Sequence, residues 1–267
     1  MPLKVKNFVD IMNNFAPENL KEDYDNVGLM VGDSEGEVSS ILVALDCTMQ
    51  VIDEALNRKC NLIMTHHPLL FYKPSKITSD TLSGRKIIKL IKNDISVYSS
   101  HTNLDSAGGG LNDIIMQLLG FNNYEIIEMK DDHVNCGIGR ITKLNECISL
   151  RDVCTKVKQA LNIPVIRYCG DDSKPIKKIA VINGSGQDYF AQAVKKGADC
   201  IITGDTTYHY ISDLNEQNIS VIDAGHFETE WSSMSIIAEK VRKQLNIMDF
   251  NNSVILSETC FSPYKYK

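Results

Sequence analysis

A strand–helix–strand pattern in the first third of the chain constrains the fold most strongly. An apolar run at 41–45 is followed by apolar residues at helical spacing over 49–59 and by a second apolar run at 62–64. A connection of this length through a helix joins two parallel strands of one sheet. The pattern therefore predicts an α/β fold with a parallel sheet.

The second half of the chain repeats this pattern. A shift of 138 residues places Ile41 on Ile179 and, without a gap, Thr65 on Thr203. Further on, Ile95-Ser-Val is repeated as Ile219-Ser-Val. Such self-similarity indicates duplicated βαβ units, although βαβ units also resemble one another through composition alone. We predict two similar α/β domains.

The segment between the two copies has a different character. Residues 124–175 carry glycines and alternating apolar stretches, which favour antiparallel strands and the beginning of a second domain. No low-complexity linker divides the chain, and a helix expected at 232–245 returns to the first domain. The predicted domains are accordingly 1–128 with 236–267, and 129–235.

Histidines stand where three predicted strands end. His66 and His67 follow an apolar run and precede Pro68, which favours a turn that lets two neighbouring side chains converge. Two further apolar runs end in a histidine with a carboxylate four residues later, and these pairs are His101 with Asp105 and His226 with Glu230. Carboxyl ends of parallel strands meet at one edge of a sheet, so these side chains can converge.

Imidazole and carboxylate groups are the ligands of divalent transition metals. A single histidine at a strand end is more often a hydrogen-bonded structural residue, but four of the six histidines fall in these three places. The other two, His133 and His209, are expected at the surface. Five or six ligands exceed the need of one tetrahedral zinc, and two ions about 3.5–4 Å apart that share carboxylates fit better.

The composition narrows the functional class. The chain has 267 residues, 43% of them hydrophobic, and a net charge of -6, which does not attract a nucleic-acid backbone. No run is long enough to span a membrane and no signal peptide is evident, so we expect a cytoplasmic protein. Eight cysteines without a C-x-x-C pair predict reduced, buried thiols. A glycine run at 108–110 can bind an anion ahead of a helix, but it is more often a flexible turn.

Five motifs together resemble the NIF three-like family, also known as type-two GTP cyclohydrolase I. They are Tyr24-Asp-Asn-Val-Gly-Leu-Met-Val-Gly, Thr65-His-His-Pro-Leu-Leu-Phe, Ser100-His-Thr-Asn-Leu-Asp, Ile202-Thr-Gly-Asp and Asp223-Ala-Gly-His-Phe-Glu-Thr-Glu. The chain departs from the family in having Tyr24 where tryptophan is usual, and it is too short for the ferredoxin-like domain that some members insert.

The resemblance implies two similar, interlinked α/β domains, a toroidal homohexamer and a dinuclear metal centre. Its motifs place metal ligands at His66, His67, Asp105, His226 and Glu230. His101 is then a further ligand or an acid/base neighbour. The metals are two divalent ions per subunit, and zinc, iron, manganese and nickel all suit these ligands.

The function that follows is a metal-dependent hydrolase, in which metal-bound hydroxide attacks a nucleotide-like or other small substrate. The family name points to opening of the GTP imidazole ring, yet we identify no guanine or triphosphate signature in the chain. The alternative is a non-catalytic metal-handling protein or metallochaperone. A third hypothesis is an interaction scaffold in which the metal only stabilises the fold.

Overall fold

The computed structural model describes residues 2–130 and 134–265 and divides into two compact units. The first comprises Met1–Leu104 and Met234–Phe261, and the second comprises Asp105–Ser233 and Ser262–Lys267. We predicted a border near residue 128. The observed border comes earlier because helix α5 (Leu111–Leu118) packs against the sheet of the second unit.

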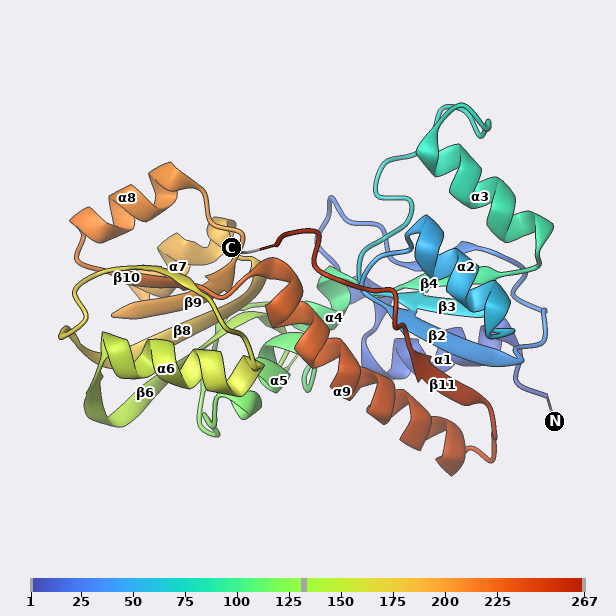
Figure 1. Ribbon diagram of the computed structural model, residues 1–267. Coiled ribbons are helices and arrows are strands. Elements are labelled where there is room, and N and C mark those ends of the chain that lie inside the picture. Colours follow the sequence, from blue (N-terminus) through green and yellow to red (C-terminus); the bar gives the residue numbers. More distant parts are fainter. Residues whose placement is uncertain (1, 131–133, 266–267) are drawn as a thin grey trace. The chain divides into compact units, whose positions relative to one another are not determined.

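Five strands form the sheet of the first unit, in the order β1-β4-β3-β2-β11 (Figure 1). They are β1 (Gly28–Val31), β2 (Ser40–Ala44), β3 (Leu62–Thr65), β4 (Ser96–Ser99) and β11 (Ser253–Leu256). All neighbouring pairs are parallel except β1 with β4. The predicted parallel sheet is thus confirmed in this unit.

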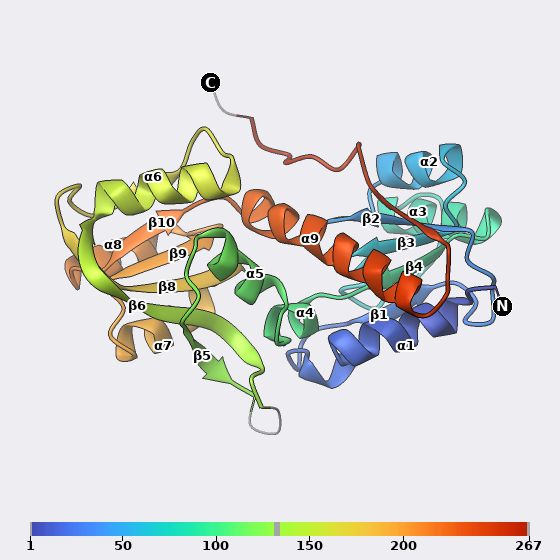
Figure 2. The ribbon, with the colours of Figure 1, turned by 90° about the horizontal axis from the view of Figure 1, so that it is seen from below.

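Helices cover both faces of this sheet (Figure 2). α2 (Met49–Asn57) and α3 (Leu82–Lys92) lie on one face, and α1 (Val5–Phe15) lies on the other beside the later turns of α9 (His226–Ile247). The ring of Phe8 meets that of Tyr98 edge-on, with 5.5 Å between centroids, which fixes α1 against β4. A short 3₁₀ helix, η1 (Glu18–Leu20), follows α1.

The carboxylate of Glu54 on α2 binds the C-terminal segment of the first unit. It accepts hydrogen bonds from Ser257 Oγ at 2.6 Å, from Glu258 N at 2.9 Å, and from Thr259 N at 3.1 Å and Oγ1 at 2.8 Å. Arg58 Nη1 donates a further bond at 2.9 Å. Strand β11 and the residues after it are therefore integral to the first unit.

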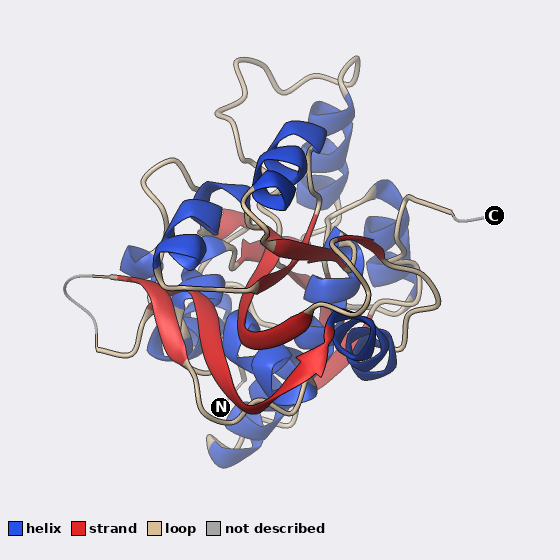
Figure 3. Ribbon diagram, turned by 90° about the vertical axis from the view of Figure 1, so that its left-hand side faces the viewer, coloured by secondary structure: helices blue, strands red, loops and turns tan. Residues whose placement is uncertain are grey.

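Six strands form the sheet of the second unit, in the order β5-β6-β8-β9-β10-β7, and Figure 3 shows their twist. They are β5 (Glu125–Met129), β6 (Gly137–Ser149), β7 (Arg167–Cys169), β8 (Pro175–Ser185), β9 (Cys200–Gly204) and β10 (Ser220–Asp223). β8, β9 and β10 are parallel, whereas β5, β6 and β7 pair antiparallel with their neighbours. The expected antiparallel strands between the two copies are present.

Alternate residues of strand β8 enter two separate cores. Ile179 and Val181 pack with α5 and α6 (Leu150–Leu161) on one face. Ala180 and Ile182 pack with α7 (Phe190–Lys195) and α8 (Tyr208–Glu216) on the other. Because side chains alternate along a strand, a strand apolar at every position is buried on both faces. The short helices α4 (Thr102–Ser106) and η2 (Gln187–Tyr189) complete the described elements.

The register of the parallel strands supports the internal repeat. Ile41 of β2 lies opposite Leu62 of β3, and Ile179 of β8 lies opposite Cys200 of β9. Both residues of the second pair stand 138 positions after those of the first. An antiparallel edge strand also pairs with the last strand of each repeated unit: β1 pairs with β4 in the first unit, and β7 pairs with β10 in the second. The shared backbone pattern agrees with the repeat found in the sequence.

Helix α9 starts earlier than the sequence indicated. We expected its first residue at Ser232, but it begins at His226 because Gly225 ends the preceding turn with φ +88° and its carbonyl accepts the bond from Thr229 N at 3.1 Å. Apolar periodicity missed this first part, in which polar side chains prevail. His226 and Glu230 are consequently one helical turn apart rather than on a loop.

All eight cysteines are thiols, and five of them are buried, as predicted; Cys147 is exposed. Within residues 2–130 and 134–265, no helix has the length and apolar character needed to cross a membrane.

Candidate metal centre

Three histidines of the first unit form a cluster at the carboxyl ends of β3 and β4. Ring nitrogens of His66, His67 and His101 lie within 4.8 Å of one another. His66 is fully buried, whereas the side chains of His67 and His101 are 24% and 19% exposed. The cluster is thus held by the core and open to solvent on one side.

Each of these imidazoles is oriented through its Nδ1 atom. The partners are Ser100 O at 2.8 Å from His66, Asp46 Oδ1 at 2.9 Å from His67, and Asp25 Oδ1 at 2.9 Å from His101. A carbonyl or an ionised carboxylate only accepts hydrogen bonds, so Nδ1 carries the proton and Nε2 carries the lone pair. This is the arrangement of histidines that bind metals.

Asp25 is the most strongly held of these partners. Besides His101, its carboxylate accepts a bond from Thr102 N at 3.0 Å, and its side chain is fully buried. Burial acts to raise the pKa of Asp25, but the hydrogen bonds from His101 and Thr102 outweigh it and hold the pKa well below its usual range. Asp25 is therefore a fixed anion behind His101.

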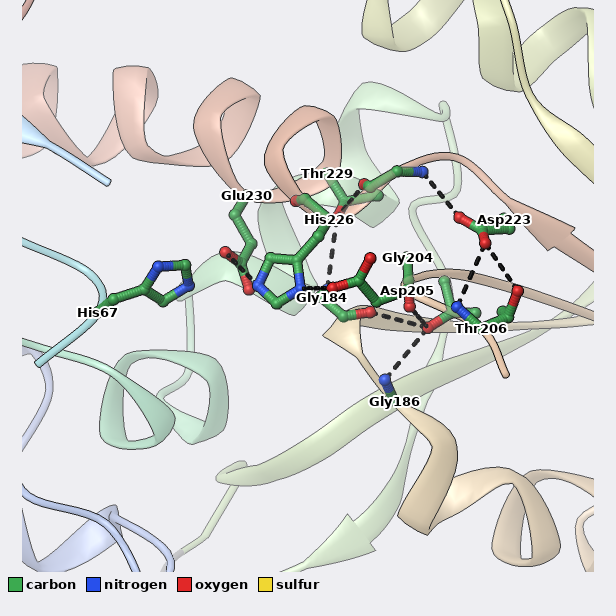
Figure 4. Close-up of polar contacts among 12 residues, drawn as sticks. His67, Gly184, Gly186, Gly204, Asp205, Thr206, Asp223, His226, Thr229 and Glu230 are labelled. Atoms are coloured by element: carbon green, nitrogen blue, oxygen red, sulfur yellow. Dashed lines mark hydrogen bonds and ion pairs between the residues drawn. The ribbon is translucent and has the colours of Figure 1, made fainter. Parts of the chain in front are cut away.

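The second unit supplies a histidine–glutamate pair on the first turns of α9 (Figure 4). His226 Nε2 lies 3.1 Å from Glu230 Oε2, and its Nδ1 lies 2.8 Å from Asp205 Oδ2. Glu230 is buried and the His226 side chain is 27% exposed. Asp205 therefore orients the His226 imidazole through Nδ1, as Asp46 orients that of His67.

Two glycines let the backbone come close to this pair. A Cβ atom at Gly184 would lie 2.2 Å from Glu230 Oε1, and the residue has φ +59°. A Cβ atom at Gly204 would lie 2.7 Å from the backbone of His226. A side chain at Gly204 would collide with backbone, whereas a side chain at Gly184 would have to displace the carboxylate of Glu230.

Asp105 lies in α4, at the start of the second unit. Asn183 Nδ2 donates to its Oδ1 at 3.3 Å, and Asn112 Nδ2 donates to its carbonyl at 3.1 Å. These bonds from β8 and α5 fix the backbone and the carboxylate of Asp105 together.

Sequence reasoning singled out the histidines but missed the carboxylates that orient them. Asp25 and Asp205 lie inside the family motifs, where the sequence assigns them no role, and the sequence does not distinguish Asp46 from other aspartates. A usable signal existed for two of them, since Asp46 and Asp205 each follow the carboxyl end of a parallel strand, β2 and β9.

His209 is on α8, exposed, with its ring 5.5 Å from that of Tyr208, and His133 lies outside the described residues. The glycine run at 108–110 does not offer an open anion site, because the carboxylate of Asp113 already accepts a bond from Gly109 N at 2.5 Å.

The donor set fits a divalent transition metal. Imidazole Nε2 atoms and carboxylates are present without thiolates, and each histidine has an oxygen acceptor on Nδ1. Within the first unit the cluster offers three nitrogen ligands, and within the second unit the pair of His226 and Glu230 offers one nitrogen and carboxylate oxygens. The carboxylate of Asp105 is held by Asn183.

The model of one protein family, Duf34/NIF3 (NGG1p interacting factor 3), matches residues 3–263. Curated relatives named GTP cyclohydrolase 1 type 2 homolog include one from Clostridium acetobutylicum, 54% identical over 100% of both chains. Another, from Clostridium perfringens, is 48% identical over 99% of this chain and 100% of its own.

Solved structures show the same fold. The Staphylococcus aureus hypothetical protein SA1388 is 29% identical over 100% of both chains, with a TM-score of 0.91. Reduced HcgD from Methanocaldococcus jannaschii is 29% identical over 97% of this chain and 99% of its own, with a TM-score of 0.81.

Proposed function

Because the chain belongs to the Duf34/NIF3 family, we propose that it is a dinuclear divalent-metal hydrolase acting on a nucleotide-like or other small substrate. The proposed ligands are His66, His67, Asp105, His226 and Glu230. One observation carries the proposal: in both units an oxygen atom lies within 2.9 Å of Nδ1 of each candidate histidine, and His226 Nε2 lies 3.1 Å from the carboxylate of Glu230. Donation of Nδ1–H to that oxygen leaves Nε2 as the atom that can bind a metal.

The protein groups have separate roles in this proposal. His66 is fixed by the core and supplies a rigid ligand position, whereas the side chains of His67 and His226 are partly exposed, each in its own unit. His101, held by Asp25, is a further ligand or the group that takes up and returns a proton at Nε2. A divalent ion, when bound, lowers the pKa of water toward neutrality and stabilises negative charge that develops on the substrate.

Metal content and turnover test this function together. We expect two divalent ions per chain by elemental analysis, fewer in His67→Ala and Glu230→Gln, and an unchanged number in Glu239→Gln, whose carboxylate lies outside the site. Product release from a panel of GTP, cyclic nucleotides and phosphoesters should fall with the metal content. Metal-loaded protein that turns over no compound, with Glu230→Gln behaving identically, would contradict the proposal.

The metallochaperone alternative gives a different result in an exchange experiment. A delivery protein loses its metal to an acceptor within minutes, whereas a catalytic centre keeps it through turnover. The identity of the metal is read from protein purified without added metal. Assembly into a homohexamer stays a prediction of the family resemblance, and light scattering of the 29.9 kDa chain measures it.

A further inference from the structure

Three exposed aromatic side chains stand beside the three-histidine cluster of the first unit. Tyr24 is 61% exposed, Phe71 37% and Tyr72 83%. The ring of Phe71 contacts the other two, with centroids 6.4 Å apart between Tyr24 and Phe71 and 4.9 Å apart between Phe71 and Tyr72. We call these three residues the aromatic wall. Neighbouring apolar rings exposed to water are a feature of binding sites.

The aromatic wall is continuous with the candidate ligands. The Phe71 ring meets the His101 ring edge-on, with 6.3 Å between centroids and 79° between planes. His101 is in turn 5.1 Å from the His66 ring and 5.7 Å from the His67 ring. The aromatic wall therefore adjoins the histidine cluster through the contact between Phe71 and His101.

One segment of three residues builds this arrangement. Tyr24 contributes its ring, Asp25 holds His101 through the 2.9 Å bond, and Asn26 Nδ2 donates to Leu70 O at 2.6 Å. The last bond fixes the loop that carries Phe71. The aromatic wall and the orientation of His101 thus depend on the same short stretch of backbone. This is expected if the wall and His101 contact one bound molecule.

We propose that the aromatic wall binds a planar heteroaromatic ring of the substrate while the scissile part of that molecule reaches the histidine cluster. This inference rests on the proposed function for the position of the reaction, but ring binding itself needs no turnover. Aromatic side chains accept any flat ring by stacking, so the wall selects for a ring-bearing compound over a ring-free one of equal charge. Tyr24 supplies such an aromatic ring.

Calorimetric titration with two probes tests the proposal. Guanosine 5′-monophosphate carries a base that ribose 5-phosphate lacks, while both share the sugar and the phosphate. We expect wild-type protein to bind the first on the order of tenfold more tightly. Phe71→Leu and Tyr24→Ala should lose this preference, whereas Tyr24→Phe and Tyr24→Trp should keep it. Phe261→Ala removes an exposed ring outside the wall and should have no effect.

The same titrations on metal-stripped protein separate this inference from the proposed function. A base preference that persists without metal and without turnover supports the wall even if no hydrolysis is found. Equal affinity for the two probes in wild-type protein, or an unchanged preference in Phe71→Leu, would overturn the inference. So would variants that keep the preference but change the molar mass in light scattering, because the wall would then be a contact between copies of the chain.

Discussion

The carboxylate of Asp46 lies 2.9 Å from Nδ1 of His67, and the carboxylate of Asp205 lies 2.8 Å from Nδ1 of His226. Each acid follows a parallel strand and orients a histidine from another element. In each unit an aspartate thus orients a candidate ligand histidine, although the two histidines are not at equivalent positions of the repeat.

Replacing either acid by its amide should weaken metal binding. In Asp46→Asn or Asp205→Asn the NH₂ group can donate to Nδ1, which moves the imidazole proton to Nε2 and removes the lone pair from the ligand position. We expect a loss of about 10- to 100-fold in zinc affinity, measured by competition with a chelator. Asp53→Asn, which removes an exposed carboxylate bound to Lys89, is the control and should bind zinc as wild type does.

A methyl group at Gly184 should displace Glu230. The added Cβ would lie 2.2 Å from Glu230 Oε1, so Gly184→Ala must move the carboxylate and reduce the bound metal. Gly197 also has a positive φ, +82°, but a Cβ there meets no atom within 4 Å. Gly197→Ala therefore measures the backbone strain alone, about 1 kcal/mol, and should keep its metal. Equal metal content in the two variants would exclude displacement of Glu230.

Acid should loosen the attachment of the C-terminal segment. Burial acts to raise the pKa of Glu54, but hydrogen bonds from Glu258, Ser257 and Thr259 outweigh it and lower the pKa to about 2, from an ordinary 4.5. Because the folded state has the lower pKa, the stabilisation is fully present above pH 4.5 and disappears as the pH falls toward 2; its upper limit is about 3 kcal/mol.

Urea unfolding of wild-type protein between pH 6.5 and 3 measures this contribution. Glu54→Gln should be less stable at pH 6.5, and its stability should depend less on pH over this range. Parallel pH curves for the two proteins would show that Glu54 does not contribute in this way.

The buried ion pair of the second unit should make single substitutions costly. Arg140 is 1% exposed; it donates to Asp113 and, at 2.7 and 3.0 Å, to the carbonyls of Gly137 and Gly139. Asp113→Asn leaves a buried cation without its counter-charge, and we expect a loss of about 3–5 kcal/mol in the free energy of unfolding. The double variant Asp113→Leu with Arg140→Met should lose less free energy of unfolding than the sum of the losses in Asp113→Leu and Arg140→Met measured singly. A loss in the double variant equal to that sum, measured by denaturant unfolding, would contradict a direct coupling.

Apolar pattern was sufficient to predict the layered part of the fold. The strands around Ile41 and Ile179 are buried on both faces, which leaves a continuous apolar run, and their repeat spacing appears again in the strand register. The start of α9 and the border at Leu104 escaped prediction. The first depends on the positive φ of Gly225, and the second on which sheet α5 packs against, neither of which is a property of local composition.

The histidines could be found because their residue type is informative by itself. Their partners could not, since an aspartate near a strand end is more often a capping or solvated residue, and only distance identifies Asp46 and Asp205. Exposure of Tyr24 beside Phe71 likewise becomes visible only when both rings are placed in space.

The bonds between Glu54 and the segment at Ser257–Thr259 also bear on the order in which the protein folds during synthesis. Nearly all of the second unit is one uninterrupted stretch, so it can form as soon as that stretch has left the ribosome. The sheet of the first unit is completed later, because β2 lacks its neighbour β11 until Ser253–Leu256 have emerged. A nascent chain stalled just before residue 253 should hence expose the edge of β2 to chaperones, and a C-terminal truncation of the same length should remain in that state.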